Sequence, residues 1–322
     1  MKPEPSFRQK SFPILVAVVV LVLMAVTGFV ANTLYRSHQR YLDEADNTAR
    51  NLSAVLDNAL QSHFQEVDLA LQRARREFSD MHSEGRFTPE RFSAYLRTLK
   101  ERVPQAASIR GTDAAGMVVY GEDIDPAKLV DLKVREFYQR ARDEDGLVFG
   151  VPVRSRITGK MVFPLVTALR KPDGSFGGVA YINMNNARIS TLIASLKLGP
   201  HGVITLVDNR RRLLHRYPEL DGVEPGKQLG VSPLAEALMD KGGKQLSYAA
   251  VSRLDGEMRR FSVQRIGDYP VLVVVGLSER DILDPWYGEV RSALAFLLAL
   301  YLVSAVLLWA KRTAVTRQGQ AV

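Results

Sequence analysis

The chain has 322 residues and a formal net charge of +8 at pH 7. It contains no cysteine, which excludes a disulfide framework, and its five histidines lack the i, i+4 spacing and the H-E-x-x-H pattern of a metal site. The two tails, residues 1–13 and 311–322, carry +2 and +3 of this net charge, and no run of basic residues with interleaved aromatic residues occurs. The charge therefore does not indicate binding of nucleic acid.

Two long stretches without a charged residue indicate membrane helices. Residues 14–34 and 292–310 contain 21 and 19 residues, which as helices reach about 31 and 28 Å, the thickness of a bilayer core. Basic flanking residues place both tails, residues 1–13 and 311–322, in the cytoplasm. A cleaved signal peptide is the alternative for the first stretch, but its apolar run is longer than a signal peptide needs and no clean A-x-A site follows.

A single long stalk helix is expected over residues 35–83. From residue 36 it has no proline or glycine, and apolar or small residues recur every three or four positions. Two interpretations stay open: the seam packs on its own domain, or its lower half forms the contact of a homodimer. The seam consists of Leu42, Ala45, Ala49, Leu52, Leu56, Ala59, His63, Val67, Leu71, Ala74 and Phe78.

The residues after the stop signal Glu84-Gly85 contain a shorter helix, at about 89–103, and then two copies of one strand-rich pattern. "SIRGTDAAGMVVYG" and "GVITLVDNRRRLLHRYP" each form two strands around a turn, with Asp113 and Asp208 at equivalent places. Met161 and Met258 follow these aspartates by 48 and 50 residues, and each opens a long strand. We expect a duplicated α+β unit, with copies at 84–196 and 197–283. A lead-in and the second membrane helix follow at 284–310.

"TGKMVFPLVTALRKPDGSFGGVAYINMN", residues 158–185, is predicted to form a hairpin with its turn at 171–175. Strand alternation places Tyr181 and Asn183 on one face. A buried amide needs a partner, so Asn183 either caps the helix that follows or bonds internally, or it meets a ligand. Asn185 and Asn186 are expected to serve the turn or helix cap that follows.

A cytoplasmic tail, a membrane helix, a stalk helix, two tandem PAS-like sheets and a returning membrane helix resemble the double Cache sensor module of bacterial transmembrane receptors. The resemblance covers nearly all of residues 12–311. The segment from "REFYQRARDEDGLVFG" to "GGVAYINMN" is especially similar to the modules fused to diguanylate cyclases and sensor histidine kinases. The fold implied is α+β, with two antiparallel-sheet domains between two transmembrane helices.

The resemblance also implies a ligand pocket in the first copy, the membrane-distal domain. In the family an Arg-x-aromatic-Tyr element binds a ligand carboxylate, and an aspartate about 48 residues later takes the amine. Here the corresponding positions hold Arg135 and, in place of the aspartate, Asn183, while Val153 and Ser155 replace a further tyrosine and acid. A carboxylate or another small anion is therefore favoured over a free amino acid. The candidate ligand-binding residues are Arg135, Phe137, Tyr138, Arg154, Tyr181 and Asn183.

The second copy offers fewer polar candidates, because the arginines at 210–212 are expected to lie exposed in a turn, and it is interpreted as a structural coupler. No nucleophile elbow, Walker loop or dinucleotide motif indicates an enzyme, a metal or a cofactor. We expect a periplasmic small-molecule sensor in the bacterial inner membrane that contacts lipid, forms a homodimer through its stalk and acts on a cytoplasmic effector domain or partner protein. The alternative is a membrane-anchored protein that binds a periplasmic protein without a small ligand.

Overall fold

The computed structural model of the chain describes residues 7–185, 191, 193–229 and 243–319. It divides into unit 1, formed by Met1–Ala45 with Glu279–Val322, and unit 2, formed by Asp46–Ser278. The outermost tail residues and Asn186 lie outside the described part, so the cap expected at Asn186 is not tested.

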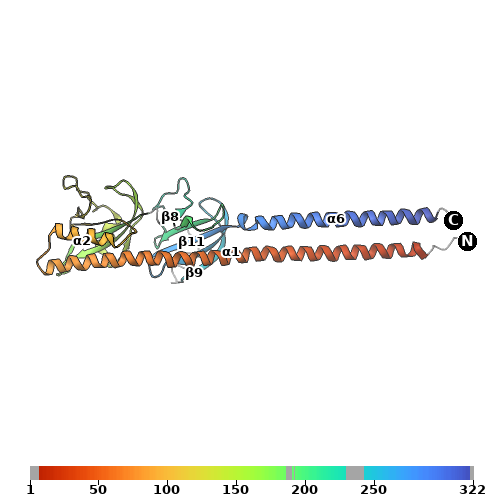
Figure 1. Cartoon of the computed structure of the whole chain (residues 1–322), viewed down its shortest axis with the longest axis horizontal. Coiled ribbons are helices and arrows are strands. Elements are labelled where there is room, and N and C mark those ends of the chain that lie inside the picture. The colour runs from red at the N-terminus through yellow and green to blue at the C-terminus, as the bar shows by residue number, and fades with distance from the viewer. Residues whose placement is uncertain (1–6, 186–190, 192, 230–242, 320–322) are drawn as a thin grey trace. The chain divides into compact units, whose positions relative to one another are not determined.

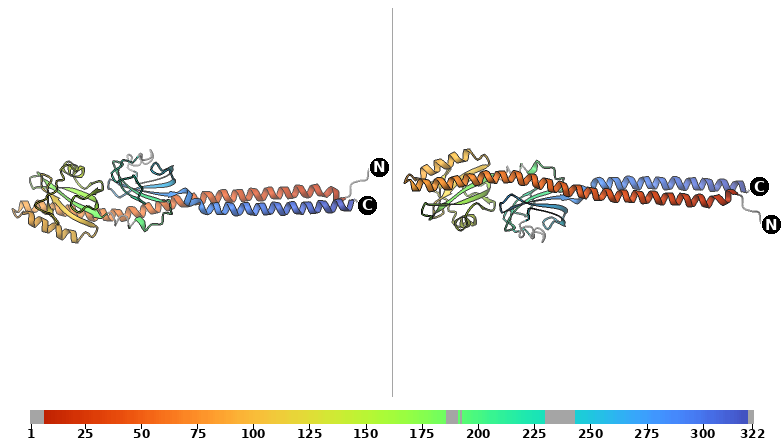
Figure 2. Two further views of the ribbon diagram at one scale, coloured as in Figure 1. Left: turned by 90° about the horizontal axis from the view of Figure 1, so that it is seen from above. Right: turned by 90° about the horizontal axis from the view of Figure 1, so that it is seen from below.

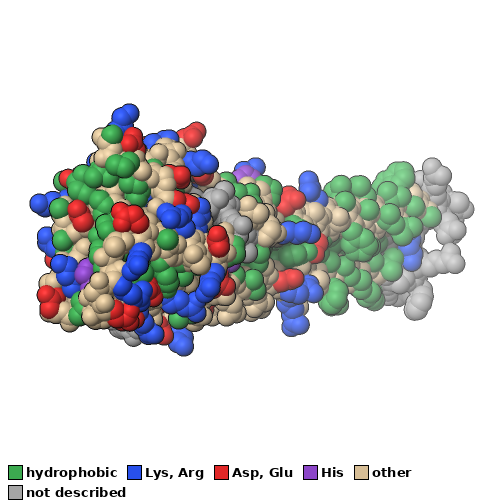
Figure 3. Space-filling model, turned by 60° about the vertical axis from the view of Figure 1, so that its left-hand side comes forward, with side chains coloured by type: hydrophobic (Ala, Val, Ile, Leu, Met, Phe, Trp, Pro, Cys, Tyr) green, Lys and Arg blue, Asp and Glu red, His purple; other side chains and the backbone are tan. Residues whose placement is uncertain are grey.

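Unit 1 consists of two helices. It contains the first part of α1 (Phe7–Ser83) and all of α6 (Glu279–Gly319). Both helices are long and apolar enough to cross a membrane, and their most apolar stretches are not buried by protein. Figure 3 shows hydrophobic side chains gathered over this part of the surface. The pair is joined by a hydrogen bond between Thr27 Oγ1 and Tyr301 OH of 3.0 Å and by one from Trp286 Nε1 to the Leu34 carbonyl of 3.0 Å.

Unit 2 contains two antiparallel sheets beside the remainder of α1 (Figures 1 and 2). Sheet domain 1 has the strand order β2-β1-β6-β5-β3, with β4 also paired to β5, and sheet domain 2 has the order β8-β7-β11-β10-β9. Because the two orders follow the same pattern, the expected duplication is confirmed. The strands are β1 (Ala106–Thr112), β2 (Val118–Gly121), β3 (Val148–Phe149), β4 (Val153–Arg154), β5 (Met161–Arg170), β6 (Phe176–Asn185), β7 (Val203–Asp208), β8 (Leu213–Tyr217), β9 (Gln245–Val251), β10 (Met258–Arg265) and β11 (Val271–Ser278).

The turns between the strands have the expected chemistry. Asp113 Oδ1 accepts from the Met117 amide, and Asp208 Oδ1 accepts from the Arg210 and Arg212 amides, so the two aspartates hold equivalent turns. Between β5 and β6, Asp173 Oδ1 accepts from the Ser175 amide, and Gly174 has φ +81°. Gly178 opens β6 at φ +129°, where a Cβ atom would lie 2.0 Å from the Thr112 carbonyl oxygen. Only glycine permits β1 and β6 to approach so closely.

The stalk seam packs on the chain's own sheets. Ala49, Leu56, Val67, Leu71, Ala74 and Phe78 of unit 2 are all buried. Phe64 contacts the rings of Phe149 and Phe163 edge to face, at centroid distances of 5.0 and 6.4 Å. The interpretation that the seam packs on its own domain is therefore confirmed for this part of α1. The helix ends before Gly85, at φ +67°, and α2 (Pro89–Glu101) begins after Thr88, whose hydroxyl accepts from the Arg91 amide.

Candidate ligand pocket

The face of sheet domain 1 that is turned away from α1 carries the candidate site. In the β1–β6 register, Arg110 lies opposite Tyr181 and Ser108 lies opposite Asn183, so all four side chains share one face. The apolar part of this face is covered by α3 (Glu136–Asp143), through Phe137, Tyr138 and Ala141. Tyr181, expected beside Asn183, is 4% exposed and packs in this cluster.

A small cavity of about 30 Å³ lies beside Tyr181 and Asn183. Five of the six candidate residues line it: Arg135, Phe137, Arg154, Tyr181 and Asn183. The sixth, Tyr138, lies apart from it and donates its hydroxyl to the Ala114 carbonyl at 3.1 Å. A cavity of this volume holds about one or two water molecules.

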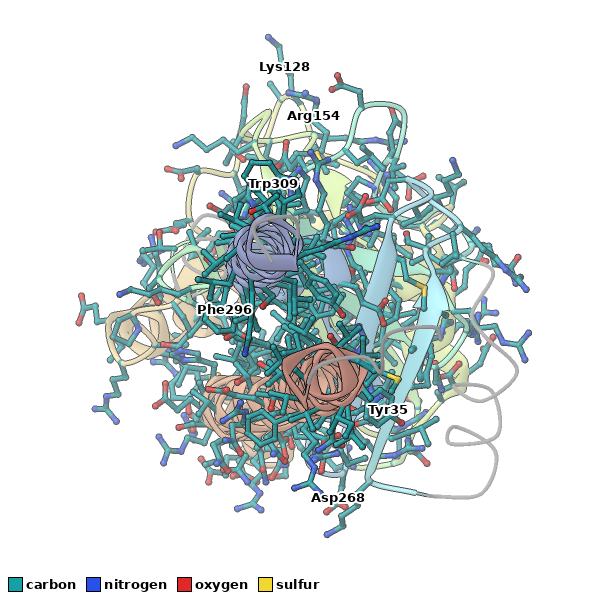
Figure 4. All side chains as sticks on the ribbon, turned by 90° about the vertical axis from the view of Figure 1, so that its right-hand side faces the viewer. Tyr35, Lys128, Arg154, Asp268, Phe296 and Trp309 are labelled. Atoms are coloured by element: carbon teal, nitrogen blue, oxygen red, sulfur yellow. The ribbon has the colours of Figure 1, made fainter. Side chains whose placement is uncertain are left out.

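A second cavity of about 220 Å³ adjoins the first. The two share Val130, Arg156 and Ile157 in their linings, and the second reaches Asp123 and Lys128 in the segment between β2 and α3. The loops that carry these residues extend away from α1 (Figure 1), and Figure 4 shows Lys128 and Arg154 on that side of unit 2. Together the cavities form a pocket divided by the side chains of two loops.

Three arginines, Arg135, Arg154 and Arg156, line the small cavity, and none of its described lining residues is acidic. The Arg135 guanidinium has no hydrogen-bond or ion-pair partner among the described residues, while Arg154 donates to the Gly159 carbonyl at 2.8 Å and Arg156 to the Asp131 carbonyl at 3.0 Å. Burial, and secondly the positive charge of Arg156, lower the pKa of Arg135. Among the described residues no carboxylate lies within ion-pair distance of the three, so the wall of the cavity is positive. An anion placed there would relieve this repulsion.

The floor of the cavity is a hydrogen-bonded chain. Asn183 Nδ2 donates to Ser108 Oγ at 3.0 Å, and Arg110 Nη1 donates to the same oxygen at 2.9 Å. Arg110 also donates from Nε to the Glu122 carbonyl at 2.9 Å, and its Nη2 lies 3.5 Å from Asp123 Oδ2. Burial raises the pKa of the Tyr181 hydroxyl well above its usual range, and the nearby positive charge of Arg110 opposes this rise.

Sequence analysis did not single out Arg110 or Ser108. An arginine in the middle of an apolar strand is usually at the surface, whereas Arg110 is the largest side chain among those that are fully buried. The signal that identifies it is the alternation of Ser108, Arg110 and Thr112 on one face. That signal has meaning only when the register places it opposite Tyr181 and Asn183.

Sheet domain 2 is tied to α3 of sheet domain 1. Arg210 Nη1 lies 2.9 Å from Glu136 Oε1, and Arg212 pairs with Glu136 Oε2 and with Asp208. The expectation that residues 210–212 are simply exposed is therefore wrong for Arg212, whose side chain is 14% exposed. Because Glu136 directly follows Arg135, the ion pairs connect the pocket wall to the second sheet.

A third cavity, of about 570 Å³, lies between the two sheet domains. Its lining mixes Arg154, His215 and Arg216 with exposed carboxylates of the loop at 219–224. Burial lowers the pKa of His215, and the neighbouring Glu219 opposes this. Since both signs of charge are present, the cavity indicates no single class of ligand.

Comparisons with known proteins agree with this architecture. The family model of the Cache domain, dCache_1, matches residues 32–286. The extracellular domain of rpHK1S-Z16, assigned as a histidine kinase, is 28% identical, with a TM-score of 0.64 over 76% of this chain and 99% of that one. The sensory domain of the Campylobacter jejuni chemoreceptor Tlp1 shares 9% identity at a TM-score of 0.61, covering 76% of this chain and 99% of its own.

The ligand-binding domain of the Pseudomonas fluorescens chemoreceptor CtaA, in complex with L-isoleucine, is 17% identical, with a TM-score of 0.55 over 77% of this chain and 98% of that one. At this identity the likeness concerns the fold. Among curated protein sequences, none matches the chain.

Proposed function

Since this chain belongs to the Cache domain family, whose model covers residues 32–286, we propose that it is the periplasmic small-molecule sensor of a bacterial transmembrane receptor. Its ligand is a small carboxylate or another small anion, bound in sheet domain 1, the membrane-distal domain. Arg135, Phe137, Tyr138, Arg154, Tyr181 and Asn183 form or support the pocket. The observation that carries the proposal is the group of three arginines around a cavity with no carboxylate among its lining residues.

Charge supports an anion over a cation. Arg135 is half-buried and loses free energy by desolvation and by repulsion from Arg156, and an anion that binds beside it restores this free energy. Arginine also fits a carboxylate geometrically, because its planar fork donates two parallel hydrogen bonds. Arg135 lies at the N-terminal boundary of α3, and its side chain makes no capping hydrogen bond there. Its guanidinium is therefore available for this role.

The size of the cavity supports a conformational response. A ligand larger than a water molecule or two requires the side chains of Arg156 and Ile157 to move and join the cavities of about 30 and 220 Å³. Two arrangements of the loops follow, a closed one and an open, ligand-bound one. A ligand shifts their populations by its difference in affinity for the two.

The ion pairs of Glu136 with Arg210 and Arg212 provide the route from the pocket to sheet domain 2. A change at Arg135 moves the start of α3, and through Glu136 it acts on Arg210 and Arg212 of sheet domain 2. From there the signal passes to the membrane helices, with both chain ends in the cytoplasm of the inner membrane, and to a cytoplasmic effector domain or partner protein. Lipid contacts the apolar surface of α1 and α6.

The homodimer uses a face of α1 other than the buried seam. The exposed positions of α1 within unit 2 include an uncharged heptad pattern. Two copies anchored side by side in one membrane run parallel, so equal positions meet, and amide side chains both donate and accept hydrogen bonds. The face consists of Thr48, Asn51, Val55, Asn58, Ser62, Gln65, Leu69 and Gln72.

The test uses the full chain in lipid nanodiscs and thermal unfolding against panels of carboxylates, amino acids, amines and purines. We expect carboxylates to raise the melting temperature, Arg135→Ala to abolish the shift and Arg142→Ala to preserve it. Arg142 is a matched control because it lies in α3 and, among the described residues, its side chain forms an ion pair only with its neighbour Asp143. Stabilisation by amines alone, or no stabilisation together with capture of a periplasmic protein, would contradict the proposal and favour the interaction protein.

A further inference from the structure

Arg110 is a buried cation directly behind the cavity floor. Its side chain is 1% exposed, and the carboxylate nearest to it, Asp123, is 75% exposed and 3.5 Å away. Its hydrogen-bond acceptors, the Glu122 carbonyl and the Ser108 hydroxyl, carry no charge. Because its one ion-pair partner among the described residues is largely exposed to water, which screens it, the buried guanidinium keeps a positive potential around it.

The hydrogen bonds around Arg110 determine which atoms of the cavity floor can still form hydrogen bonds with a ligand. Asn183 uses its nitrogen on Ser108, so its oxygen Oδ1 remains as an acceptor, and it has no other partner among the described residues. Tyr181 lines the cavity, and burial raises the pKa of its hydroxyl well above its usual range, so it keeps its proton and its O–H serves as a donor. The floor therefore presents one acceptor and one donor side by side, on neighbouring positions of one strand face.

A hydroxyl group satisfies both floor atoms, because its oxygen accepts from Tyr181 while its hydrogen is donated to Asn183 Oδ1. An ammonium group has three donors and no acceptor, so it leaves the Tyr181 O–H unsatisfied. It also places a positive charge near the Arg110 guanidinium, separated from it only by the hydrogen-bonded side chains of Ser108 and Asn183. Both effects act against an amine.

We infer that Arg110 is a positioning residue that makes the pocket select small hydroxy-carboxylates over the amino acids of the same shape. The inference rests on the proposed function, since the carboxylate of the ligand is taken by Arg135 and the neighbouring arginines. The α-hydroxyl then occupies the floor. Arg110 acts through Ser108, Asn183 and Tyr181 and does not line the cavity itself.

The experiment measures binding of matched pairs by calorimetry to the full chain in nanodiscs: L-lactate against L-alanine, glycolate against glycine, and L-malate against L-aspartate. The members of a pair differ in a hydroxyl against an ammonium group. We expect the hydroxy acid of at least one pair to bind about tenfold more tightly or better, because juxtaposed like charges oppose the amine. Equal or tighter binding of the amino acids, lost in Arg135→Ala, would overturn this inference and leave the proposed function standing. Binding of no carboxylate at all would overturn both.

Variants test the role of Arg110 through the ratio of the two dissociation constants, which a loss of stability alone does not change. Arg110→Met removes the charge and is expected to lower the preference for the hydroxy acid about tenfold. Arg142→Met, with the same change of net charge at an exposed position, leaves the ratio unchanged.

Two further variants keep the inference testable if Arg110→Met fails to fold. Asn183→Asp places an anion where an amine can pair with it, so the ratio shifts toward the amino acid. Asp123→Asn removes the exposed anion near Arg110 at a position, φ +52°, that asparagine adopts readily, so the preference for the hydroxy acid rises. A ratio that none of these variants changes would refute the role of Arg110.

Discussion

Ser37 of α1 donates its hydroxyl to Oε2 of Glu289 on α6 at 2.5 Å. The other carboxylate oxygen, Oε1, accepts from the Tyr41 hydroxyl at 2.9 Å. One turn away, the Trp286 ring meets His38 edge to face, at a centroid distance of 4.9 Å. These contacts join the two helices of unit 1 next to the expected membrane spans, and they involve a charged acceptor, which strengthens such bonds.

Glu289→Ala is expected to loosen this contact, because it leaves the Ser37 and Tyr41 hydroxyls without their acceptor. The fluorescence of Trp286 reports on this contact when Trp309, the other of the chain's two tryptophans, is replaced by phenylalanine. We expect a red-shifted emission and faster quenching by acrylamide. Asp284→Ala removes the same charge from an exposed position and should leave the spectrum as it was. An unchanged emission in Glu289→Ala would mean that the contact does not hold the helices together.

Glu136→Gln should separate ligand binding from its transmission. The amide cannot form the ion pairs with Arg210 and Arg212, whereas the lining of the cavity is unaffected. We expect the dissociation constant of the best-binding carboxylate to change less than about threefold, since partly exposed ion pairs contribute little to stability. Hydrogen exchange of β7 and β8 should respond to the ligand in the parent chain and not in the variant. Glu90→Gln, on α2, is the control, and an equal response in Glu136→Gln would rule out this route.

Much of the fold could be predicted because its signals are local. The turn at 171–175 depends on a proline, an aspartate and a glycine within five residues, and the repeat could be read from the spacing of Asp113 to Met161 and Asp208 to Met258. Arg135 was found through a family pattern, and Asn183 through the same pattern together with the strand alternation of the hairpin. Both line the same cavity.

The remaining features depend on contacts between residues that are distant in the chain. Arg110 is buried because Ser108, Glu122 and Tyr181 surround it. The sequence pattern of β1 alone does not predict this burial. The ion pair of Arg212 with Glu136 likewise joins residues 76 positions apart. The exposed, uncharged face of α1 can be identified only from the structure, in which the sheets cover the apolar seam.

Asp255 is expected to be a major source of stability in sheet domain 2. It pairs with Arg216 and Arg259, whose side chains are 7% and 4% exposed. Burial raises the pKa of Asp255, but hydrogen bonds from Arg259 and Ser252 outweigh this and lower it overall. Asp255→Asn leaves two buried cations without their anion, at a cost of about 3–5 kcal/mol in the free energy of unfolding.

The pH dependence of this effect has a definite sign. Because the folded pKa of Asp255 is lowered, its stabilisation is present above the unfolded value of about 3.9 and is lost as the pH falls further toward the folded value. Urea unfolding should show a constant difference between the parent and Asp255→Asn from pH 7 to 5 and a shrinking one below pH 4. The exposed Asp268→Asn serves as the control. A difference that grows on acidification would contradict the assignment.

The uncharged face of α1 predicts where two copies of the chain meet. Val55 and Leu69 are 54% and 52% exposed and lie two heptads apart, at positions that face their equals in a parallel coiled coil. Since the chain has no cysteine, Val55→Cys and Leu69→Cys each introduce a single thiol. At such positions the Cα atoms come close enough for a disulfide, so mild oxidation in native membranes should give a disulfide-linked dimer for both variants. Lys128→Cys, on the side of unit 2 away from α1 (Figure 4), should remain monomeric on a non-reducing gel. If Lys128→Cys forms the dimer as fully as Val55→Cys, the copies meet by chance collision and α1 is not their interface.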